Sequence, residues 1–472
     1  MCSCFSPVNS VKKEKVGSNC KCTIEYLCNH SCLTWSTQPF LGDGRSKTAA
    51  GNVMISASIL FSGLTYTRTR HFADIMNLAF VSESTFYELQ SKFLLPVVNE
   101  AWVKQRSSML SELATGNLER QFAGDGQCDS PGFNAKYCTY TFMEKDTGKI
   151  ADFELVHVGQ TGTSQAMEKH GFCTALDRLL NSNVNVKVIA TDRHVGIRSV
   201  MKKKYSLLGI EHQFDVYHLV NSIRKKLTPL TKQKKHSDLA EWERSILNHV
   251  WYSSRNCGGD AEVLVELFTS ITFHVAGIHR WTGNKHVNEC RHNPLTPEQQ
   301  KQTKWLKGAS LMELKLIIHN KTLLEDITKL TLFCHTGSLE TFHSKKLAYA
   351  PKRQEFDYHC MLGRSQLAAL DHNANVGREQ VKVTQAREGG AAVGQPKFKE
   401  AWKKQTCQWV AQTVYEPTTK THKLPLLARV LDLKTSGEIL TPAEIPQVPS
   451  NIARKPRPEK AEVIAKHISR FC

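Results

Sequence analysis

The sequence lacks the features that mark secreted and membrane-spanning proteins. Its longest apolar run, VMISASILFSGL, is too short to cross a bilayer. The first residues, MCSCFSPVNSVKKEK, lack a basic segment followed by an apolar core, so they predict no secretory signal. The 15 cysteines are odd in number and scattered, which is not the pattern of a disulfide framework. We therefore expect a soluble, intracellular protein in a reducing compartment, with no membrane partner.

Acidic residues are scarce relative to basic ones. The 62 lysines and arginines outnumber the 44 aspartates and glutamates, which gives a formal net charge of +18 at pH 7. Such an excess favours a polyanionic partner, nucleic acid first, although membrane-surface and merely soluble basic proteins carry similar charge. The 40% apolar and 22% charged residues among 472 are typical of a globular chain. This length allows for roughly two to four domains.

Residues 1–48 form a polar arm that is rich in cysteine. Its candidate zinc ligands are Cys20, Cys22, Cys28, His30 and Cys32. Thiolates and an imidazole this close in sequence suit one tetrahedral Zn2+. The spacing lacks the repeated C-x2-C pair of a standard zinc finger. Two interpretations stay open, a degenerate zinc module and a flexible arm with free thiols.

Residues 49–117 have a helical pattern. The stretches GNVMISASILFSG, TYTRTRHFADIMNLA and SESTFYELQSKFLLPVV predict three helices, with Ser82 as the N-cap of the third. Three short helices with a tight turn resemble a helix-turn-helix, a pattern that is also common in plain helical bundles. The candidate DNA contacts in this region are Arg68, Arg70 and Lys92.

Residues 118–221 alternate between strands and helices. RQFAGDGQCDS is a short apolar run that ends in acid, and KYCTYTFMEKDTGKIADFELVHV predicts two strands joined by a turn at residues 146–148. A helix, QAMEKHGFCTALDRLLNS, precedes VKVIATD, a short β-branched strand of the kind found in the buried middle of a sheet. The order β-β-β-α-β-α-β-α predicts an α/β layer domain whose first three strands form a meander.

The remaining chain divides into three parts. Residues 222–330 are mostly helical and interrupt the α/β pattern. Residues 331–394 contribute two further helices, which we expect to complete the α/β domain. Residues 395–472 are basic and contain several prolines, so they predict a loosely structured tail.

Three acids stand where the local structure changes. Asp125 ends the first strand, Asp192 follows the strand VKVIAT, and Glu340 opens a helix beyond the helical block. If the first and fourth strands are neighbours, the two aspartates lie side by side and a packed helix brings the glutamate. Such a cluster favours Mg2+ or Mn2+, since like charges raise one another's pKa and hard ions prefer oxygen ligands. The alternatives are a tight turn, a helix cap and an exposed helical glutamate.

These motifs in this order resemble the eukaryotic DDE cut-and-paste DNA transposases with an RNase-H-like catalytic domain and a helical insertion, the group with the Kolobok, hAT and Mutator-like superfamilies. GDGQCDSPGFNAKYCTYTFMEKDTGKIADFELV is similar to the opening meander, VIATDRHVGI to the second-aspartate strand and HTGSLETFHSKKLAYAPK to the final-glutamate helix. FDVYHLVNSIRKKL carries Asp215 and His218, which match the (C/D)xxH signature. The resemblance covers about residues 51–375.

The resemblance implies a fold, an activity and partners. The expected fold is an RNase-H-like mixed sheet flanked by helices, and the interval of 148 residues from Asp192 to Glu340 (340 − 192) holds the insertion. The implied activity cuts and joins DNA phosphodiesters at element ends with two Mg2+ or Mn2+ ions. The implied partners are terminal inverted repeats, target DNA and further copies of the chain, in the nucleus.

The resemblance also implies roles for individual residues. Asp125, Asp192 and Glu340 would bind the ions. Asp215 and His218 would lie near the active site, in contact with the scissile phosphate or a flipped nucleotide; the alternative is a histidine at a helix start that Asp215 satisfies. Asp129 is the alternative first acid, but it precedes Ser-Pro-Gly and suits a turn, whereas Asp125 ends the apolar run QFA. Basic residues near the site predict phosphate contacts. They are Arg193, Lys202, Lys203, Lys204, Arg224, Lys225 and Lys226.

Three rival interpretations remain at this point. The first is a domesticated or inactive transposase-derived protein that binds DNA without cutting it. The second is an RNase-H-like nuclease or resolvase that hydrolyses DNA but never joins strands. The third is a basic helical adaptor without a mixed sheet, in which the acids are only caps.

Overall fold

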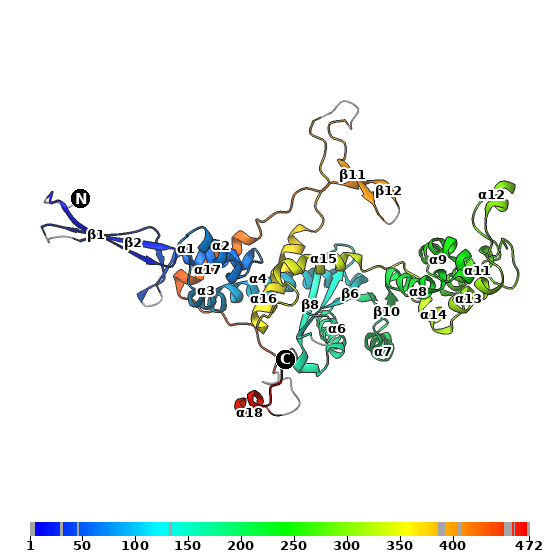
Figure 1. Ribbon diagram of the computed structural model, residues 1–472, viewed down its shortest axis with the longest axis horizontal. Coiled ribbons are helices and arrows are strands. Elements are labelled where there is room, and N and C mark those ends of the chain that lie inside the picture. Colours follow the sequence, from blue (N-terminus) through cyan, green and yellow to red (C-terminus); the bar gives the residue numbers. More distant parts are fainter. Residues whose placement is uncertain are drawn as a thin grey trace.

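The structure is a computed structural model that describes most of the chain. The described residues are 5–28, 32–44, 47–131, 135–385, 392–404, 407–447, 456 and 458–469. Figure 1 shows an elongated molecule in which the N-terminal strands β1 (Val8–Val16) and β2 (Asn19–Tyr26) lie at one end. A helical region, a sheet and a second group of helices follow in that order toward the other end. No helix in the described part of the chain has both the length and the apolar character to span a bilayer.

A mixed sheet of five strands lies at the centre (Figure 1). Its order is β10-β9-β6-β7-β8, in which β6, β7 and β8 form an antiparallel meander and β9 and β10 are added in parallel beyond β6. The strands are β6 (Arg120–Cys128), β7 (Tyr137–Glu144), β8 (Ile150–His157), β9 (Val186–Thr191) and β10 (Glu211–Phe214). The predictions of a mixed sheet and of an opening meander are confirmed, and the basic helical adaptor without a sheet is wrong.

Helices cover both faces of this sheet. Every residue of β7 is buried, because helix α6 packs on one face and helices α4, α15 and α16 lie on the other. Gly148 has a φ of +66° in the predicted turn between β7 and β8, a conformation that glycine adopts without strain. The helices of this part are α5 (Val158–Thr161), α6 (Ser164–Asn181), α7 (Val195–Lys203), α8 (Val216–Thr231), α15 (Gly337–Tyr349) and α16 (Tyr358–Asn375).

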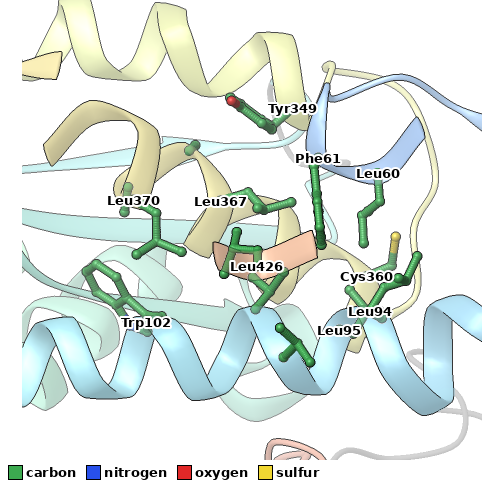
Figure 2. Close-up of a cluster of buried hydrophobic side chains, with 14 of the residues drawn as sticks. Leu60, Phe61, Leu94, Leu95, Trp102, Tyr349, Cys360, Leu367, Leu370 and Leu426 are labelled. Carbon is green, nitrogen blue, oxygen red and sulfur yellow. The ribbon is translucent and has the colours of Figure 1, made fainter. Parts of the chain in front are cut away.

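The helical region before the sheet shares one hydrophobic core with α15, α16 and α17 (Lys423–Ser436). It contains α1 (Ala50–Phe61), α2 (Tyr66–Ile75), α3 (Glu83–Leu89), a π-helical turn (Gln90–Leu94) and α4 (Leu95–Ala114). Figure 2 shows Trp102 of α4, Leu367 and Leu370 of α16 and Leu426 of α17 pointing into the same space. The Ser82 hydroxyl accepts a hydrogen bond from the Thr85 N–H, so the predicted N-cap is confirmed. The third predicted helix continues through the π-helical turn into α4.

Arg364 on α16 joins separate segments by hydrogen bonds from its buried guanidinium. The group donates to the carbonyl oxygens of Tyr349 at 2.7 Å, Leu64 at 2.8 Å and Gly63 at 3.2 Å. Gly63 has a φ of +81°, and a Cβ there would lie 2.4 Å from the Ala348 carbonyl oxygen, so only glycine permits this approach. These bonds fix the end of α15 against the turn between α1 and α2.

The second group of helices has a hydrophobic core of its own. It comprises α9 (Ser237–Asn256), α10 (Ala261–Thr269), α11 (Ile271–His274), α12 (Pro297–Gln302), α13 (Gly308–Ile318) and α14 (Lys321–Ile327). Helix α8 contributes Ile223 and Leu227 to this core, in which Leu264 and Leu314 are also fully buried. Helix α8 therefore runs unbroken across the predicted boundary between residues 221 and 222, because its apolar face serves both parts.

The arm of residues 1–48 contains a sheet that the sequence does not predict. Strands β1 (Val8–Val16), β2 (Asn19–Tyr26) and β3 (Cys32–Ser36) are antiparallel, and β4 (Phe40–Leu41) pairs with β5 (Thr48–Ala49). The described residues of the arm therefore form strands, and the choice between a zinc module and a flexible arm with free thiols stays open. The sheet escapes prediction because most of β1 is exposed, so no apolar face imposes an alternating pattern.

The loosely structured tail over residues 395–472 is also partly wrong. Strands β11 (Phe398–Lys403) and β12 (Gln408–Thr413) form a hairpin, α17 (Lys423–Ser436) packs on α1 and α4, and α18 (Lys460–Ala465) is exposed. Helix α17 buries Leu426, Val430 and Leu433 in the core shared with α1, α4 and α16. Their spacing of three and four residues is that of one helix face.

Two leucines of α17 offer a matched test of this packing. Leu433 is fully buried, whereas Leu424 is 63% exposed. Leu433→Ala is expected to lower the free energy of unfolding by about 2–5 kcal/mol, since it leaves a cavity. Leu424→Ala is expected to change it by less than about 0.5 kcal/mol. Chemical denaturation measures both, and equal effects of the two substitutions would contradict the docking of α17.

Candidate active site

Asp125 and Asp192 lie side by side at one edge of the central sheet. Strand β6 pairs in parallel with β9, with Ala123 opposite Ala190, so two residues further along Asp125 stands level with Asp192. Burial first, and then the negative charge of Asp125, raise the pKa of Asp192. The adjacency expected from neighbouring first and fourth strands is therefore present.

The two carboxylates have few hydrogen-bond donors around them. Asp125 accepts a bond from the Gly126 N–H at 2.8 Å, and its other oxygen lies 3.4 Å from Nδ1 of His343. Asp192 accepts from the His194 N–H at 3.1 Å. Asp192 is not the N-cap of α7, because His194 takes that position and its Nδ1 accepts from the Ile197 N–H. The helix-cap alternative for Asp192 is therefore wrong.

A third carboxylate, Glu168, joins this pair and is absent from the sequence-based predictions. It lies on α6, where its side chain faces Gly126 so closely that a Cβ on that glycine would be 2.8 Å from Glu168 Cγ. Burial, and then the charges of Asp192 and Asp125, raise the pKa of Glu168 to about 8. Glu168 therefore carries a proton for much of the time at neutral pH. The amphipathic pattern of α6 gave no reason to place this acid near the aspartates.

Glu340 approaches this edge from helix α15. Its Oε1 lies 3.9 Å from Nε2 of His218, and the charge of His218 acts in turn on Asp192. His343 lies one turn after Glu340 on the same face of α15 and approaches Asp125. The Glu340 side chain is 52% exposed, so it lies at the solvent side of the cluster. The structure thus brings Glu340 and His218 to the same edge as the two aspartates.

Asp215 has a different place from the one expected. It is 1% exposed, and its Oδ1 caps α8 by accepting from the N–H groups of Tyr217 at 2.6 Å and His218 at 3.3 Å. Its Oδ2 accepts from the Thr336 N–H at 2.8 Å and from the Thr336 hydroxyl. Both oxygens are thus engaged inside the protein. The expectation of a contact with the scissile phosphate is corrected, because Asp215 positions α8 and α15.

Asp129 lies beyond the cluster and behaves as a turn residue. Its carboxylate accepts from the Lys136 N–H at 3.1 Å, and burial raises its pKa. Among nearby charges, the buried ammonium of Lys346 acts on Asp129 and donates to the Thr139 hydroxyl at 2.6 Å. Burial lowers the pKa of Lys346 to about 8. These contacts favour Asp125 over Asp129 as the partner of Asp192.

The predicted DNA-binding residues fall into two groups. One group binds acids within the chain: Arg70 with Asp74, Lys92 with Glu88, Lys204 with Asp177, and Arg193 with the buried Asp326. Arg193 also donates to the Ser222 hydroxyl at 3.0 Å, so it ties the loop after Asp192 to the helical insertion. Arg193 therefore has a structural contact, and its contact with DNA stays a prediction. The other group is exposed and consists of Arg68, Lys202, Lys203, Arg224, Lys225 and Lys226.

The predicted zinc module of the arm stays a prediction. Cys20 and Cys22 lie on one face of β2 and interact, and Cys28 follows that strand. His30 and the side chain of Cys32 lie outside the described residues. Among the described residues, the group of histidine and cysteine side chains with metal-binding distances lies elsewhere, at residues 274–292.

Comparisons with known proteins add little to this geometry. The chain matches no family model and none of the curated proteins compared with it. Among solved structures it is similar to a chain of the Drosophila P element transposase strand transfer complex, at 10% sequence identity and a TM-score of 0.30. That similarity covers 67% of this chain and 92% of the other. At this TM-score the similarity carries no inference about function.

Burial of Glu168, and then the charges of Asp192 and Asp125, predict a pH effect on stability. The pKa of Glu168 rises from its usual 4.5 to about 8 on folding, so folding favours the protonated form. The stability from this group is present below about pH 4.5. This contribution to stability is lost as the pH rises from about 4.5 through about 8. The free energy of unfolding falls by about 1.4 kcal/mol for each pH unit in that range. Glu168→Gln is therefore expected to raise the free energy of unfolding at about pH 8–9 and to leave it unchanged at about pH 4.

Denaturant titrations across this pH range measure the effect. Glu112→Gln is the control, because Glu112 is an exposed glutamate of α4 away from the cluster. It is expected to follow the wild-type curve at every pH. A Glu168→Gln curve that also parallels wild type would show that folding does not raise the pKa of Glu168.

Proposed function

We propose that this chain is a DDE-type DNA transposase, a metal-dependent polynucleotidyl transferase that cuts and joins DNA phosphodiesters at element ends. The observation that carries the proposal is the parallel pairing of β6 with β9, which puts Asp125 beside Asp192 at a sheet edge. The strand order agrees with the RNase-H-like fold that the motifs imply, an opening meander whose first strand neighbours the fourth. The helical insertion between Asp192 and Glu340 also agrees with the interrupted RNase-H-like fold that the motifs imply.

The donor set of this edge fits hard divalent ions. Asp125, Asp192 and Glu168 offer carboxylate oxygens alone, and burial together with the neighbouring negative charges raises the pKa of Asp192 and of Glu168. Asp125 and Asp192 are the proposed ligands of Mg2+ or Mn2+, with Glu340 as a further ligand or base. When bound, two such ions activate an attacking water or 3′-hydroxyl and stabilise the leaving oxygen of an in-line displacement.

The side chains around the acids have separate proposed tasks. His218 lies between Asp192 and Glu340 and is half exposed, so its Nε2 is available to a phosphate oxygen of bound DNA. His343 orients Asp125 from α15. Glu168, with its raised pKa, holds a proton beside the two aspartates or becomes an additional oxygen ligand. Asp215 positions the two helices that carry His218 and Glu340.

The proposed partner is double-stranded DNA, both terminal inverted repeats and target. A net charge of +18 supports a polyanionic partner, and the exposed residues 224–226 continue along α8, the helix that begins beside His218. Binding that rests on such contacts weakens steeply as salt rises. We further propose a dimer or larger assembly that acts in the nucleus on paired ends.

Two alternatives differ from this proposal in chemistry. A domesticated or inactive copy binds DNA without cutting it, and the presence of Asp125, Asp192 and Glu340 disfavours this alternative. An RNase-H-like nuclease or resolvase hydrolyses DNA without joining strands. The same acidic edge serves both hydrolysis and strand transfer, so the products of the reaction distinguish them.

A cutting assay tests the proposal directly. Purified protein is incubated with a plasmid that carries candidate terminal inverted repeats and with Mg2+ or Mn2+, and strand breaks and joined products are counted. Asp192→Asn and Asp125→Asn are each expected to reduce the rate of cutting more than about 100-fold. This loss is larger than the loss of about 10-fold to 100-fold that is usual for a residue that only supports a metal ligand. The reason is the loss of a charged oxygen at the ion-binding edge.

Asp129→Asn is the matched control, because Asp129 lies on the same strand extension but accepts a turn hydrogen bond. It is expected to retain cutting within about 10-fold of wild type. Cutting that survives Asp192→Asn would overturn the three-carboxylate mechanism. Nicks without joined products would favour the nuclease.

A further inference from the structure

The helical insertion contains a compact group of three histidines and one cysteine. One ligand atom from each of His274, His279, Cys290 and His292 lies within 4.8 Å of every other. Among these atoms, Cys290 Sγ is 3.5 Å from His274 Nδ1, and His292 Nε2 is 3.3 Å from His279 Nδ1. The group lies in the insertion, whereas the acidic edge is on the central sheet, and no step of the proposed function uses it.

These distances agree with tetrahedral coordination of one ion. Zinc bonds of about 2.05 Å to nitrogen and about 2.3 Å to sulfur separate two nitrogens by about 3.3 Å and a nitrogen from a sulfur by about 3.6 Å. The observed 3.3 Å and 3.5 Å match both values. The distance of 3.3 Å between His292 Nε2 and His279 Nδ1 also exceeds the usual range of about 2.7–3.2 Å for a hydrogen bond donated by N–H.

The backbone of the insertion holds the four side chains together. The Cys290 N–H donates to the His279 carbonyl at 3.0 Å, and the Trp281 N–H donates to the Asn288 carbonyl at 2.9 Å, so residues 279–290 form a small antiparallel loop. His279 and Cys290 are thereby placed opposite each other at its base. His274 ends α11, and His292 follows two residues after the cysteine.

A carboxylate closes the far end of this loop. Glu266 on α10 accepts hydrogen bonds of 2.8 Å from the N–H groups of Lys285, His286 and Val287. The Trp281 ring stacks on Phe273 of α11 with centroids 4.9 Å apart. The loop is therefore anchored to the preceding helices independently of the four side chains, which is a built support for them.

The second nitrogen of His292 has a partner that fixes its tautomer. His292 Nδ1 lies 2.6 Å from the Asn293 carbonyl oxygen, to which only a protonated nitrogen can donate. Nε2 is then the nitrogen with a free lone pair, and it is the atom that faces His279. A backbone carbonyl on the outer nitrogen is the usual arrangement for a histidine that binds a metal.

Two indole rings lie on one side of the cluster, beside His274 and His279. The Trp305 ring lies 5.4 Å from that of His279, and the Trp242 ring lies 5.7 Å from that of His274, measured between centroids. These two indoles also contact each other. An apolar wall of this kind restricts water at His274 and His279 and strengthens their bonds to a cation.

We propose that His274, His279, Cys290 and His292 bind one structural Zn2+ that clips the loop of residues 275–292 onto the helical insertion. Three imidazoles and a thiolate suit zinc, a borderline-soft ion, and not the hard ions of an all-oxygen edge. Four protein ligands close the coordination shell, which is the mark of a structural site and not of a catalytic one. The ion replaces the thiol proton of Cys290, which leaves to solvent on binding, and the imidazoles bind through free lone pairs.

The test measures metal in the full-length chain. Because the cysteines of the arm are a second candidate for zinc, the protein is prepared both as wild type and with Cys20→Ser, Cys22→Ser, Cys28→Ser and Cys32→Ser. Elemental analysis after dialysis is expected to find about one zinc per chain in the variant of the arm. Replacement of zinc by Co2+ is expected to give the visible bands of a tetrahedral site and a charge-transfer band from one thiolate.

Substitutions in the insertion, made in the background of the arm variant, assign the ligands. Cys290→Ser is expected to remove the thiolate band, and Cys290→Ser with His292→Gln to lower zinc affinity about 100-fold or more. His286→Gln is the matched control, because His286 belongs to the same loop but pairs with the exposed Glu262. It is expected to keep the stoichiometry and both cobalt signals.

The outcomes are decisive in either direction. Zinc that disappears when only the cysteines of the arm are replaced would overturn the proposal, as would a chain that binds neither zinc nor cobalt. A thiolate band that persists in Cys290→Ser would overturn it as well. Since the cobalt spectrum is recorded on a chain with an intact insertion, a misfolded ligand variant does not affect that result. None of these outcomes depends on whether the chain cuts DNA.

Discussion

The carboxylate of Asp215 holds together elements that the sequence separates widely. A buried charge is costly unless hydrogen bonds replace its water, and Asp215 accepts four of them, from Tyr217, His218 and twice from Thr336. Thr336 lies 121 residues further along the chain. The same group therefore starts α8 and fixes the start of α15. His218 and Glu340 meet because these two helices begin at one point.

This constraint explains how a long insertion leaves the sheet edge intact. The chain leaves the sheet after β10 and returns beside it, where the Phe214 N–H donates to the Lys329 carbonyl and the Val216 N–H to the Cys334 carbonyl. With its ends fixed, the insertion folds around a separate core, and its length adds little to the cost of closure. The contact of Arg193 with Asp326 gives a second tie, next to Asp192 itself.

Local sequence patterns predict the strands of the central sheet and the turn at residues 146–148. Contacts between elements that are distant in sequence cannot be predicted in this way. Asp192 follows a β-branched run, so its place at a strand end is visible in the sequence. Glu168 sits on an amphipathic helix, where a glutamate is exposed by default, and only the packing of α6 on the meander brings it to the aspartates. The apolar spacing of α17 was visible, but the surrounding proline and lysine residues outweighed it. The four proposed zinc ligands follow no standard spacing, and the loop fold alone brings them together.

The three acids at the edge of the sheet do not stabilise the fold. Asp125, Asp192 and Glu168 lack basic partners among the described residues other than the nearby histidines, and the raised pKa values of Asp192 and Glu168 mean that the charges of these two groups oppose folding. The opposing stability comes from elsewhere, from the core that α4, α16 and α17 form on the other face of the sheet. A destabilising group of side chains held in place by a well-packed scaffold is what a site with a function requires. If the three acids served only the fold, substitutions to neutral side chains would be favoured, because they would raise stability.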